Sequence, residues 1–354
     1  MRVLVVDDSV VVRRLVADAL SAAPDLEVTT VPSGELALTR LAIATPDAVV
    51  LDVEMPGLDG IETLRRIRAL HRDLPVIMFS KHTSRGAEAS IDALLQGASD
   101  CVAKPVGMGS REAASVYVRE ALGGRLRALC RRGAASGGAP GGRRAPTIDA
   151  VGIAVSTGGP NALLTLVGAL PADLRAPLLI VQHMPVGFTR PLAEALDRAS
   201  PLRVREARGG ERPAPGEVYL AQAGRHLSVV AGPDGPRLAL GDAPPENSCR
   251  PAADVLLRAM AEVYGARTLA LVLTGMGQDG LRGCEAVRAA GGRILAQDEA
   301  TSVVWGMPGF VTRAGLADDV LPLERLAGAL EAEVARGRSP CPAPCPAPTV
   351  GGAP

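Results

Sequence analysis

A serine near the middle of the chain stands where a nucleophile would be useful. Residues 151–155 read Val-Gly-Ile-Ala-Val, and Ser156 is followed directly by Thr-Gly-Gly-Pro. A short apolar run bounded by glycines predicts a buried parallel strand, and Pro160 suits the first turn of a helix. On such a turn a hydroxyl can reach solvent, close to helix N–H groups that can hold an oxyanion. The alternative is that Ser156 only caps the helix.

A nucleophilic serine needs a base and a group that orients the base. His183 ends the apolar run 177–182 and should emerge at the same sheet edge as Ser156. Asp279 lies in a glycine-rich turn after a further apolar run, where it could orient the imidazole while backbone N–H groups donate to an oxyanion. Each has a structural alternative, because a histidine at a strand end is often only hydrogen-bonded, and Asp279 could cap a helix over 281–290. The order Ser, His, Asp also differs from that of α/β-hydrolases, chymotrypsin and subtilisin, which argues against an ordinary esterase fold.

A second group of polar residues follows the apolar runs of the first 105 residues. Acidic groups at strand ends offer hard oxygen ligands for Mg²⁺, and an ammonium beside them can screen a phosphoryl group. One carboxylate could then accept phosphate as a nucleophile. Any one of these residues could be a solvated loop group, but the chain has only two lysines against 36 arginines, and one of them completes the set. The residues are Asp7, Asp8, Asp52, Ser80 and Lys104.

Alternating apolar runs and amphipathic stretches must position these groups. The pattern predicts two doubly wound parallel α/β domains, a flavodoxin-like one followed by a Rossmann-like three-layer one. We predict the first domain over 1–122, a Gly- and Arg-rich flexible linker over 123–147, the second domain over 148–337, and a Pro-rich disordered tail over 338–354. Strands are expected in the first domain at 3–6, 27–31, 48–51, 75–79 and 100–103, and in the second at 151–155, 178–182, 218–221, 268–273 and 293–296.

Composition excludes several classes of protein. With 354 residues, of which 47% are hydrophobic, two domains can each bury a core. A formal net charge of zero and 2% aromatic residues give no support for nucleic-acid binding. No apolar run approaches the roughly 18 residues of a membrane span or forms a signal peptide, so we expect a soluble cytoplasmic protein without membrane insertion. The six cysteines lack paired metal-ligand spacing and are expected to be reduced.

Residues 2–120 resemble the receiver domains of bacterial response regulators. The resemblance rests on Val-Val-Asp-Asp-Ser at 5–9, Leu-Asp-Val-Glu-Met-Pro-Gly-Leu-Asp-Gly at 51–60 and Val-Ala-Lys-Pro at 102–105. It implies that Asp52 is the phosphoacceptor, that Asp8 and Asp52 hold Mg²⁺ with help from Asp7, and that Ser80 and Lys104 contact the phosphoryl group. One departure is Cys101, which stands where many receivers carry an aromatic residue that swings inward on phosphorylation.

Residues 148–336 resemble the catalytic domain of chemotaxis protein-glutamate methylesterases, a family in which a receiver precedes that domain. The matching segments are Ser-Thr-Gly-Gly-Pro at 156–160, Gln-His-Met-Pro at 182–185, Arg-Pro-Ala-Ala-Asp-Val-Leu at 250–256, Thr-Gly-Met-Gly-Gln-Asp-Gly at 274–280 and the segment 296–308. The resemblance implies that Ser156 is the nucleophile, His183 the general base and acid, and Asp279 its orienting carboxylate. It also implies an oxyanion donor in the Met276 N–H, with Thr157 as a supporting residue of the loop.

The resemblance further implies hydrolysis of glutamate γ-methyl esters on chemoreceptors, with release of methanol, and deamidation of receptor glutamines. No cofactor is expected for the esterase reaction, whereas Mg²⁺ is expected for phosphorylation by a chemotaxis histidine kinase. Two other classes remain to be weighed. A DNA-binding output lacks a helix-turn-helix or a basic face, and a dinucleotide-binding domain lacks the G-x-G-x-x-G spacing, since 158–160 reads Gly-Gly-Pro.

Overall fold

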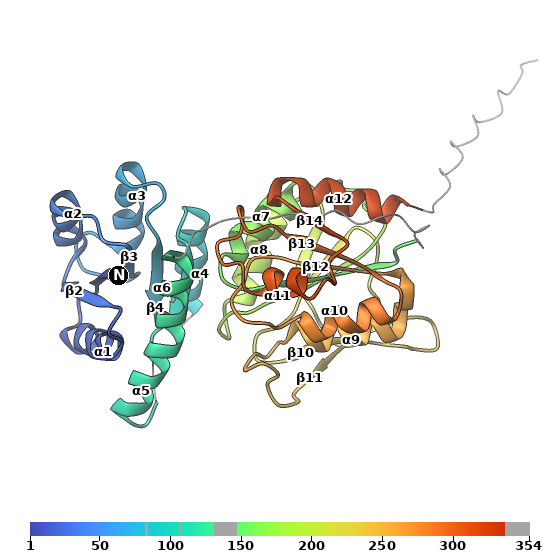
Figure 1. Cartoon of the computed structure of the whole chain (residues 1–354), viewed down its shortest axis with the longest axis horizontal. Helices are drawn as coiled ribbons and strands as arrows, with labels where there is room; N and C mark the ends of the chain where they lie inside the picture. The colour runs from blue at the N-terminus through green and yellow to red at the C-terminus, as the bar shows by residue number, and fades with distance from the viewer. Residues whose placement is uncertain (82–83, 106–107, 131–146, 337–354) are drawn as a thin grey trace, which may run out of the picture.

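The computed structural model describes residues 1–81, 84–105, 108–130 and 147–336, which form two α/β domains (Figure 1). The predicted fold class is confirmed, since each domain is built on a parallel sheet. The first sheet has five strands in the order β2-β1-β3-β4-β5 and the second has seven in the order β14-β13-β12-β6-β7-β9-β8. Every pairing in both sheets is parallel.

In the first domain, short runs rich in β-branched residues form strands because helices cover both faces of the sheet, so that apolar side chains on either face are buried. Helices α1 and α5 pack together on one face, and α2, α3 and α4 pack side by side on the other. The strands are β1 (Arg2–Val6), β2 (Glu27–Val31), β3 (Ala48–Asp52), β4 (Val76–Ser80) and β5 (Asp100–Ala103). The helices are α1 (Val10–Ser21), α2 (Gly34–Ile43), α3 (Gly60–Leu70), α4 (Ser84–Leu95), α5 (Arg111–Val118) and α6 (Gly124–Cys130).

The end of the first domain differs from the prediction. A π-helical turn, Arg119–Gly123, joins α5 to α6, so helical structure continues to Cys130 where we had placed a flexible linker from residue 123. Leu126 and Leu129 of α6 are buried, which anchors this extension on the domain. The rest of the predicted linker, 131–146, and the predicted tail lie outside the described residues.

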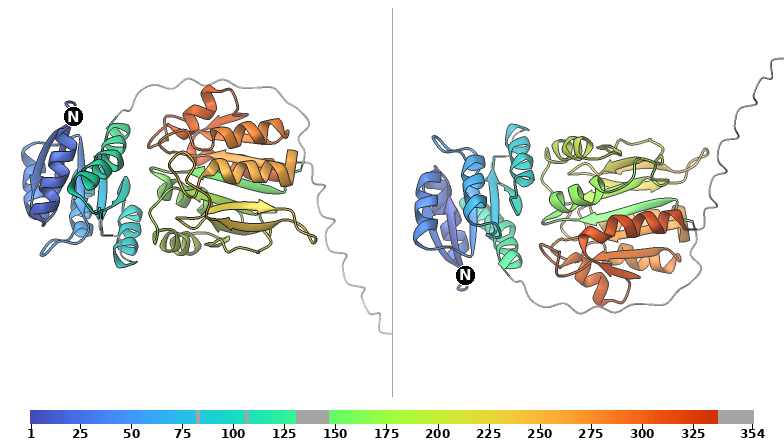
Figure 2. Two further views of the ribbon diagram at one scale, coloured as in Figure 1. Left: turned by 90° about the horizontal axis from the view of Figure 1, so that it is seen from below. Right: turned by 90° about the horizontal axis from the view of Figure 1, so that it is seen from above.

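The second domain sandwiches its sheet between α7, α8 and α12 on one face and α9, α10 and α11 on the other (Figure 2). The strands are β6 (Ala150–Val155), β7 (Leu178–Gln182), β8 (Arg203–Glu206), β9 (Glu217–Leu220), β12 (Thr268–Val272), β13 (Arg293–Gln297) and β14 (Asp319–Leu321). The helices are α7 (Gly159–Gly168), α8 (Thr189–Ala199), α9 (Ala253–Tyr264), α10 (Leu281–Ala289), α11 (Met307–Arg313) and α12 (Leu323–Ala335). A separate hairpin, β10 (His226–Val230) with β11 (Arg237–Gly241), and the strands β8 and β14 were not anticipated from the sequence.

The two domains touch through α4, which lies against α7 and α8 (Figure 1). The side-chain amide of Asn161 in α7 donates to the carbonyl of Ala98, 3.2 Å away, just before β5. A Cβ at Gly124 of α6 would lie 3.0 Å from the sulfur of Met276, so the first domain also reaches the glycine-rich turn of the second. The first domain therefore lies against the end of the second sheet that is formed by the carboxyl ends of the strands. None of the helices that the structure describes is long and apolar enough to span a membrane.

Candidate active site

Ser156 occupies the turn between β6 and α7, as the sequence predicts, but it does not cap the helix. The residue at the N-cap of α7 is Gly158, with no side-chain capping bond. The backbone of Ser156 is held instead by its neighbours, because its N–H donates to Thr274 O at 3.0 Å and its carbonyl accepts from Gly159 N at 2.8 Å. The hydroxyl is thus not used in capping, and the helix-cap alternative is wrong.

The tightness of this turn explains its two glycines. Gly158 has φ +77°, and a Cβ there would lie 2.5 Å from the Cβ of Val303. A Cβ at Gly159 would lie 1.9 Å from Oε1 of Gln182. The amide nitrogen of Gln182 also donates to the Ser156 carbonyl at 3.0 Å, so the strand β7 fixes the turn that carries the serine.

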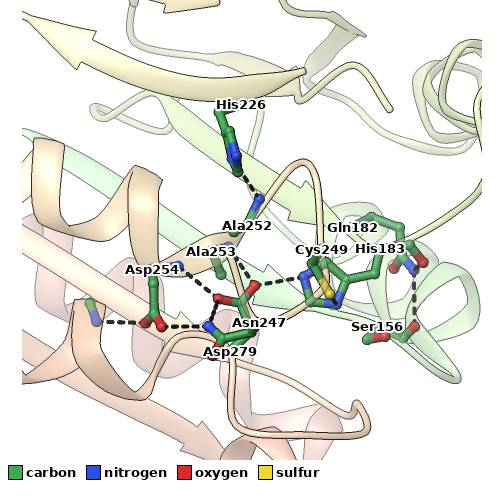
Figure 3. Close-up of polar contacts among 11 residues, drawn as sticks. Ser156, Gln182, His183, His226, Asn247, Cys249, Ala252, Ala253, Asp254 and Asp279 are labelled. Carbon is green, nitrogen blue, oxygen red and sulfur yellow. Dashed lines mark hydrogen bonds and ion pairs between the residues drawn. The ribbon is translucent and has the colours of Figure 1, made fainter. Parts of the chain in front are cut away.

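His183 follows β7, the neighbour of β6, and its imidazole is bonded to Asp279 (Figure 3). The distance from Nε2 of His183 to Oδ2 of Asp279 is 2.7 Å. Because an ionised carboxylate only accepts, Nε2 carries the proton and Nδ1 keeps the lone pair. Ser156 lies on the side of the ring away from Asp279 (Figure 3). No hydrogen bond joins its hydroxyl to His183 among the described residues, a contact that in many hydrolases tightens only with substrate.

Asp279 follows β12, and its carboxylate caps a helix other than the expected one. The N-cap of α10 is Gly280, without a side-chain bond. The carboxylate of Asp279 instead accepts the first N–H groups of α9, from Ala253 at 2.6 Å and Asp254 at 3.1 Å. Capping and orientation of the imidazole are therefore combined in one carboxylate, which makes it ionised and immobile.

The two partners shift each other's pKa. Burial acts to lower the pKa of His183, but hydrogen bonds to Asp279 and Cys249 outweigh it and raise the pKa to about 9. Burial acts to raise the pKa of Asp279, but the hydrogen bond and charge of His183 and the N–H groups of α9 hold it below its ordinary value. The pair therefore favours an ionised carboxylate beside a strongly basic imidazole.

Three residues that lie near His183 and Asp279 were not identified as site residues from the sequence, namely Asn247, Cys249 and Asp254. Asn247 donates its amide to Asp279 Oδ1 at 3.0 Å and to Asp254 Oδ2 at 2.8 Å. Cys249 places its sulfur 3.7 Å from Nδ1 of His183. Asn247 and Cys249 belong to an irregular segment, which has neither the periodicity of a helix nor that of a strand in its sequence. Asp254 lies within the matching segment 250–256, which begins one residue after Cys249.

A structural histidine holds that irregular segment in place. The ring of His226 is buried and bonds to the segment at both nitrogens: Nδ1 accepts from Ala252 N at 3.2 Å, and Nε2 lies 3.0 Å from the carbonyl of Pro244. Both ring nitrogens of His226 are thus engaged by the backbone of this segment, whereas the ring of His183 is bonded to Asp279.

The supporting residues of the predicted oxyanion site lie beside Ser156. Gly275 is so close to the serine that a Cβ there would lie 2.8 Å from the Ser156 Cβ. The next residue, Met276, makes no backbone hydrogen bond within the described part of the chain, which leaves its N–H available to an oxyanion. Thr157 is buried, and its hydroxyl makes no hydrogen bond within the described residues.

A cavity of about 270 Å³ lies between the domains and opens onto His183. On one side it is lined by Cys101, Tyr117 and Arg125 of the first domain. On the other side it is lined by residues of the second, among them His183 and Cys249. The first domain thus forms one wall of the cavity that opens onto His183.

The acidic site of the first domain is assembled as predicted. The ammonium of Lys104 lies 2.7 Å from both Asp7 Oδ2 and Asp52 Oδ2. Oxygen atoms of Asp7, Asp8 and Asp52 all lie within 4.8 Å of one another, which fits three carboxylate ligands of one Mg²⁺. Burial raises the pKa of Asp52 to about 6, although Lys104 acts against it.

The two other residues of the first domain that the sequence singled out, Ser80 and Cys101, have different surroundings. Ser80 ends β4, and its hydroxyl oxygen lies 2.8 Å from that of Ser90 in α4. Cys101 is buried in β5 and burial raises the pKa of its thiol, so the thiol stays protonated. An aromatic residue is nevertheless close, because Tyr117 of α5 donates its hydroxyl to the Ala103 carbonyl at 3.0 Å and lines the interdomain cavity.

Comparison with known families agrees with this division of the chain. A CheB methylesterase family model matches residues 151–330, and a response regulator receiver domain model matches residues 3–113. Among solved structures, the CheB methylesterase catalytic domain of Thermotoga maritima is 42% identical with a TM-score of 0.52, and the match covers 53% of this chain and 99% of that one.

Curated relatives match over nearly their whole length. A protein-glutamate methylesterase/protein-glutamine glutaminase of Trichodesmium erythraeum is 46% identical over 340 residues, which are 92% of this chain and 97% of that protein. A relative with the same name and the suffix 2, from Caulobacter vibrioides, is 45% identical over 92% of this chain and 96% of that protein.

Proposed function

Because the chain belongs to the CheB methylesterase family, with a receiver domain ahead of the catalytic one, we propose that Ser156, His183 and Asp279 are its catalytic triad. The chain is a protein-glutamate methylesterase with protein-glutamine glutaminase activity, which serves adaptation in chemotaxis. The observation that supports the triad best is the bond of 2.7 Å between His183 and Asp279, at the strand ends next to Ser156.

In the proposed reaction Ser156 attacks the carbonyl carbon of a glutamate γ-methyl ester while Nδ1 of His183 takes the hydroxyl proton. The tetrahedral oxyanion accepts from the Met276 N–H, with Thr157 supporting the loop. His183 then returns the proton to the methoxide, methanol leaves, and water hydrolyses the acyl-enzyme by the same route. Deamidation of glutamine follows the same steps with ammonia as the leaving group.

We further propose that phosphorylation of Asp52 controls access to this site. Asp7, Asp8 and Asp52 would hold Mg²⁺, which neutralises the carboxylates and the incoming phosphoryl oxygens, while Ser80 and Lys104 would contact the phosphoryl group. The receiver forms one wall of the cavity at His183, and its Gly124 lies close to Met276. A change at Asp52 that weakens this contact would shift the population towards open forms.

The partners follow from this proposal. The substrates would be the methylated cytoplasmic helices of chemoreceptors, and the phosphodonor would be a chemotaxis histidine kinase, so the protein would work in the cytoplasm. Neither a nucleic acid nor membrane insertion is required. The esterase reaction itself would use no cofactor, because the triad and the oxyanion donor account for each proton and charge.

The test of the triad is methanol release from methylated receptor membranes. Ser156→Ala should lower the rate by at least about 10³-fold, since the acyl-enzyme can no longer form. Ser228→Ala, in the β10–β11 hairpin and outside the lining of the cavity at His183, serves as the matched control and should keep the wild-type rate. Substantial methanol release by Ser156→Ala would show that another group is the nucleophile.

The test of regulation is the response to a small phosphodonor. Asp52→Asn should abolish stimulation, while the isolated 148–336 fragment keeps its activity without any phosphodonor. If the Asp52→Asn protein were stimulated as strongly as wild type, phosphorylation would act elsewhere or not at all.

A further inference from the structure

The thiol of Cys249 stands beside the catalytic imidazole on the side that Asp279 does not occupy. Its sulfur lies 3.7 Å from Nδ1 of His183, while Nε2 of the same ring is bonded to Asp279 at 2.7 Å (Figure 3). Both Cys249 and His183 line the interdomain cavity. A thiol and the imidazole nitrogen that Asp279 does not bind therefore share one small space.

We propose that Cys249 and His183 form a binding site for Zn²⁺ that inhibits the esterase. Tetrahedral zinc bound by one sulfur at about 2.3 Å and one nitrogen at about 2.0 Å separates those two atoms by about 3.5 Å. The observed separation of 3.7 Å allows the ion to bind between them with little movement of either side chain.

The rest of the site matches the way proteins support a zinc-bound histidine. A histidine ligand usually donates its other N–H to a carboxylate, which fixes the ring and strengthens the bond to the metal. Asp279 supplies that carboxylate, and it is itself held by Ala253, Asp254 and Asn247. One side-chain atom of each of the three residues His183, Cys249 and Asp279 lies within 4.8 Å of the other two.

The cavity leaves room for the ion and for the waters that would complete its coordination. Two guanidinium groups line it, but each is engaged: Arg125 pairs with Asp100 at 2.9 Å, and Arg250 donates to the carbonyls of Asp242 and Ala243. Sulfur and imidazole ligands select zinc over Mg²⁺, which prefers oxygen. The Mg²⁺ proposed for the receiver would therefore not compete.

Inhibition follows from the atom that the metal would occupy. Binding releases to solvent both the thiol proton and any proton on Nδ1 of His183, and it places the ion on the Nδ1 lone pair. That lone pair is the one that must take the proton of Ser156, so the zinc-bound enzyme cannot start the reaction. Removal of the ion by a chelator restores the lone pair and the activity.

The test uses the full-length protein with Cys341 and Cys345 replaced by Ser, so that thiols of the C-terminal segment bind no metal. Methanol release is measured against added ZnCl₂ and expressed relative to each variant's own metal-free rate. Cys249→Ser should weaken inhibition by at least about tenfold, because one of the two protein ligands is lost. Cys130→Ser, a half-buried thiol outside this cavity, is the matched control and should be inhibited like its parent.

A second readout does not depend on turnover. Cd²⁺ added to the same proteins should give a thiolate-to-metal charge-transfer band in the parent and in Cys130→Ser, and no band in Cys249→Ser. Equal zinc inhibition of the Cys249→Ser and parent proteins, a cadmium band that survives in Cys249→Ser, or no inhibition of the parent would each overturn the proposal. Because the band is seen without substrate, its loss or presence is separate from any failure of the esterase assignment.

Discussion

Each domain carries a buried carboxylate after a strand of its parallel sheet, yet the two domains shift the pKa of these carboxylates in opposite directions. Asp52 ends β3 in the receiver, and Asp279 follows β12 in the catalytic domain. Burial raises the pKa of Asp52 to about 6, whereas the pKa of Asp279 is held below its ordinary value. Strand position alone therefore does not set the chemistry of a site.

The difference lies in what surrounds each carboxylate. Asp279 accepts two backbone N–H groups, the Asn247 amide and the His183 ring. Asp52 accepts one backbone N–H, from Glu54 at 3.2 Å, and shares Lys104 with a second carboxylate, that of Asp7. The carboxylate that we propose as phosphoacceptor is left with few neutralising partners, while the one that we propose to orient an imidazole has hydrogen bonds to both oxygens.

The sharpest test of this contrast is Asp279→Asn. The amide keeps the size of the side chain but can donate to His183, which stabilises the wrong tautomer, so kcat should fall by about 10⁴-fold. Methanol release at saturating receptor measures the effect. Asp242→Asn, an exposed carboxylate paired with Arg225, is the control and should leave kcat unchanged. A loss below about tenfold in Asp279→Asn would mean that the carboxylate does not orient the base.

The pH dependence tests the same pair with a smaller effect. His183 is active only when Nδ1 is unprotonated, and its pKa is raised to about 9. The kcat/KM of the free enzyme should therefore rise with pH and gain about 50-fold between pH 7 and pH 9. An acid limb that levels off near pH 6.5 would show that Asp279 and Cys249 do not raise the pKa of His183.

The opposite pKa shift in the receiver predicts a gain in stability. Because the pKa of Asp52 is raised on folding, its ionisation destabilises the folded receiver as pH rises from about 4 through 6. Asp52→Asn should then stabilise the receiver by about 3 kcal/mol at pH 7.5 and by only about 0.5 kcal/mol near pH 4. Hydrogen exchange of the β3 amides in the full-length protein measures this opening free energy. Destabilisation at pH 7.5 would mean that Lys104 more than compensates for the burial of Asp52.

The smallest effect concerns the extra donor that Asp279 has and Asp52 lacks. Asn247→Ala removes one hydrogen bond to Asp279 Oδ1, which costs about 1 kcal/mol, so kcat should fall by about fivefold to tenfold. The acid limb of the pH profile should also move to lower pH, because a less stabilised carboxylate supports the imidazolium less well and the pKa of His183 falls. A profile that stays in place would assign Asn247 to packing of its loop only.

The sequence by itself determined the two sheets and most of their site residues. Buried parallel strands are continuous apolar runs, and the polar residue that ends each run must lie at one edge of the sheet. Ser156, His183, Asp52 and Lys104 were therefore found from local patterns. Asp279 was singled out as well, although the alternative that it caps α10 is wrong, because its carboxylate caps α9.

Only the tertiary structure decided what lies next to these residues. Asn247 and Cys249 reach His183 and Asp279 from an irregular segment whose path is fixed by the buried ring of His226, a contact between residues far apart in the sequence. The helical extension to Cys130 and the shared wall of the cavity depend equally on packing between distant segments. Local patterns report which face of an element is buried, whereas the partner that buries it is chosen by the whole fold.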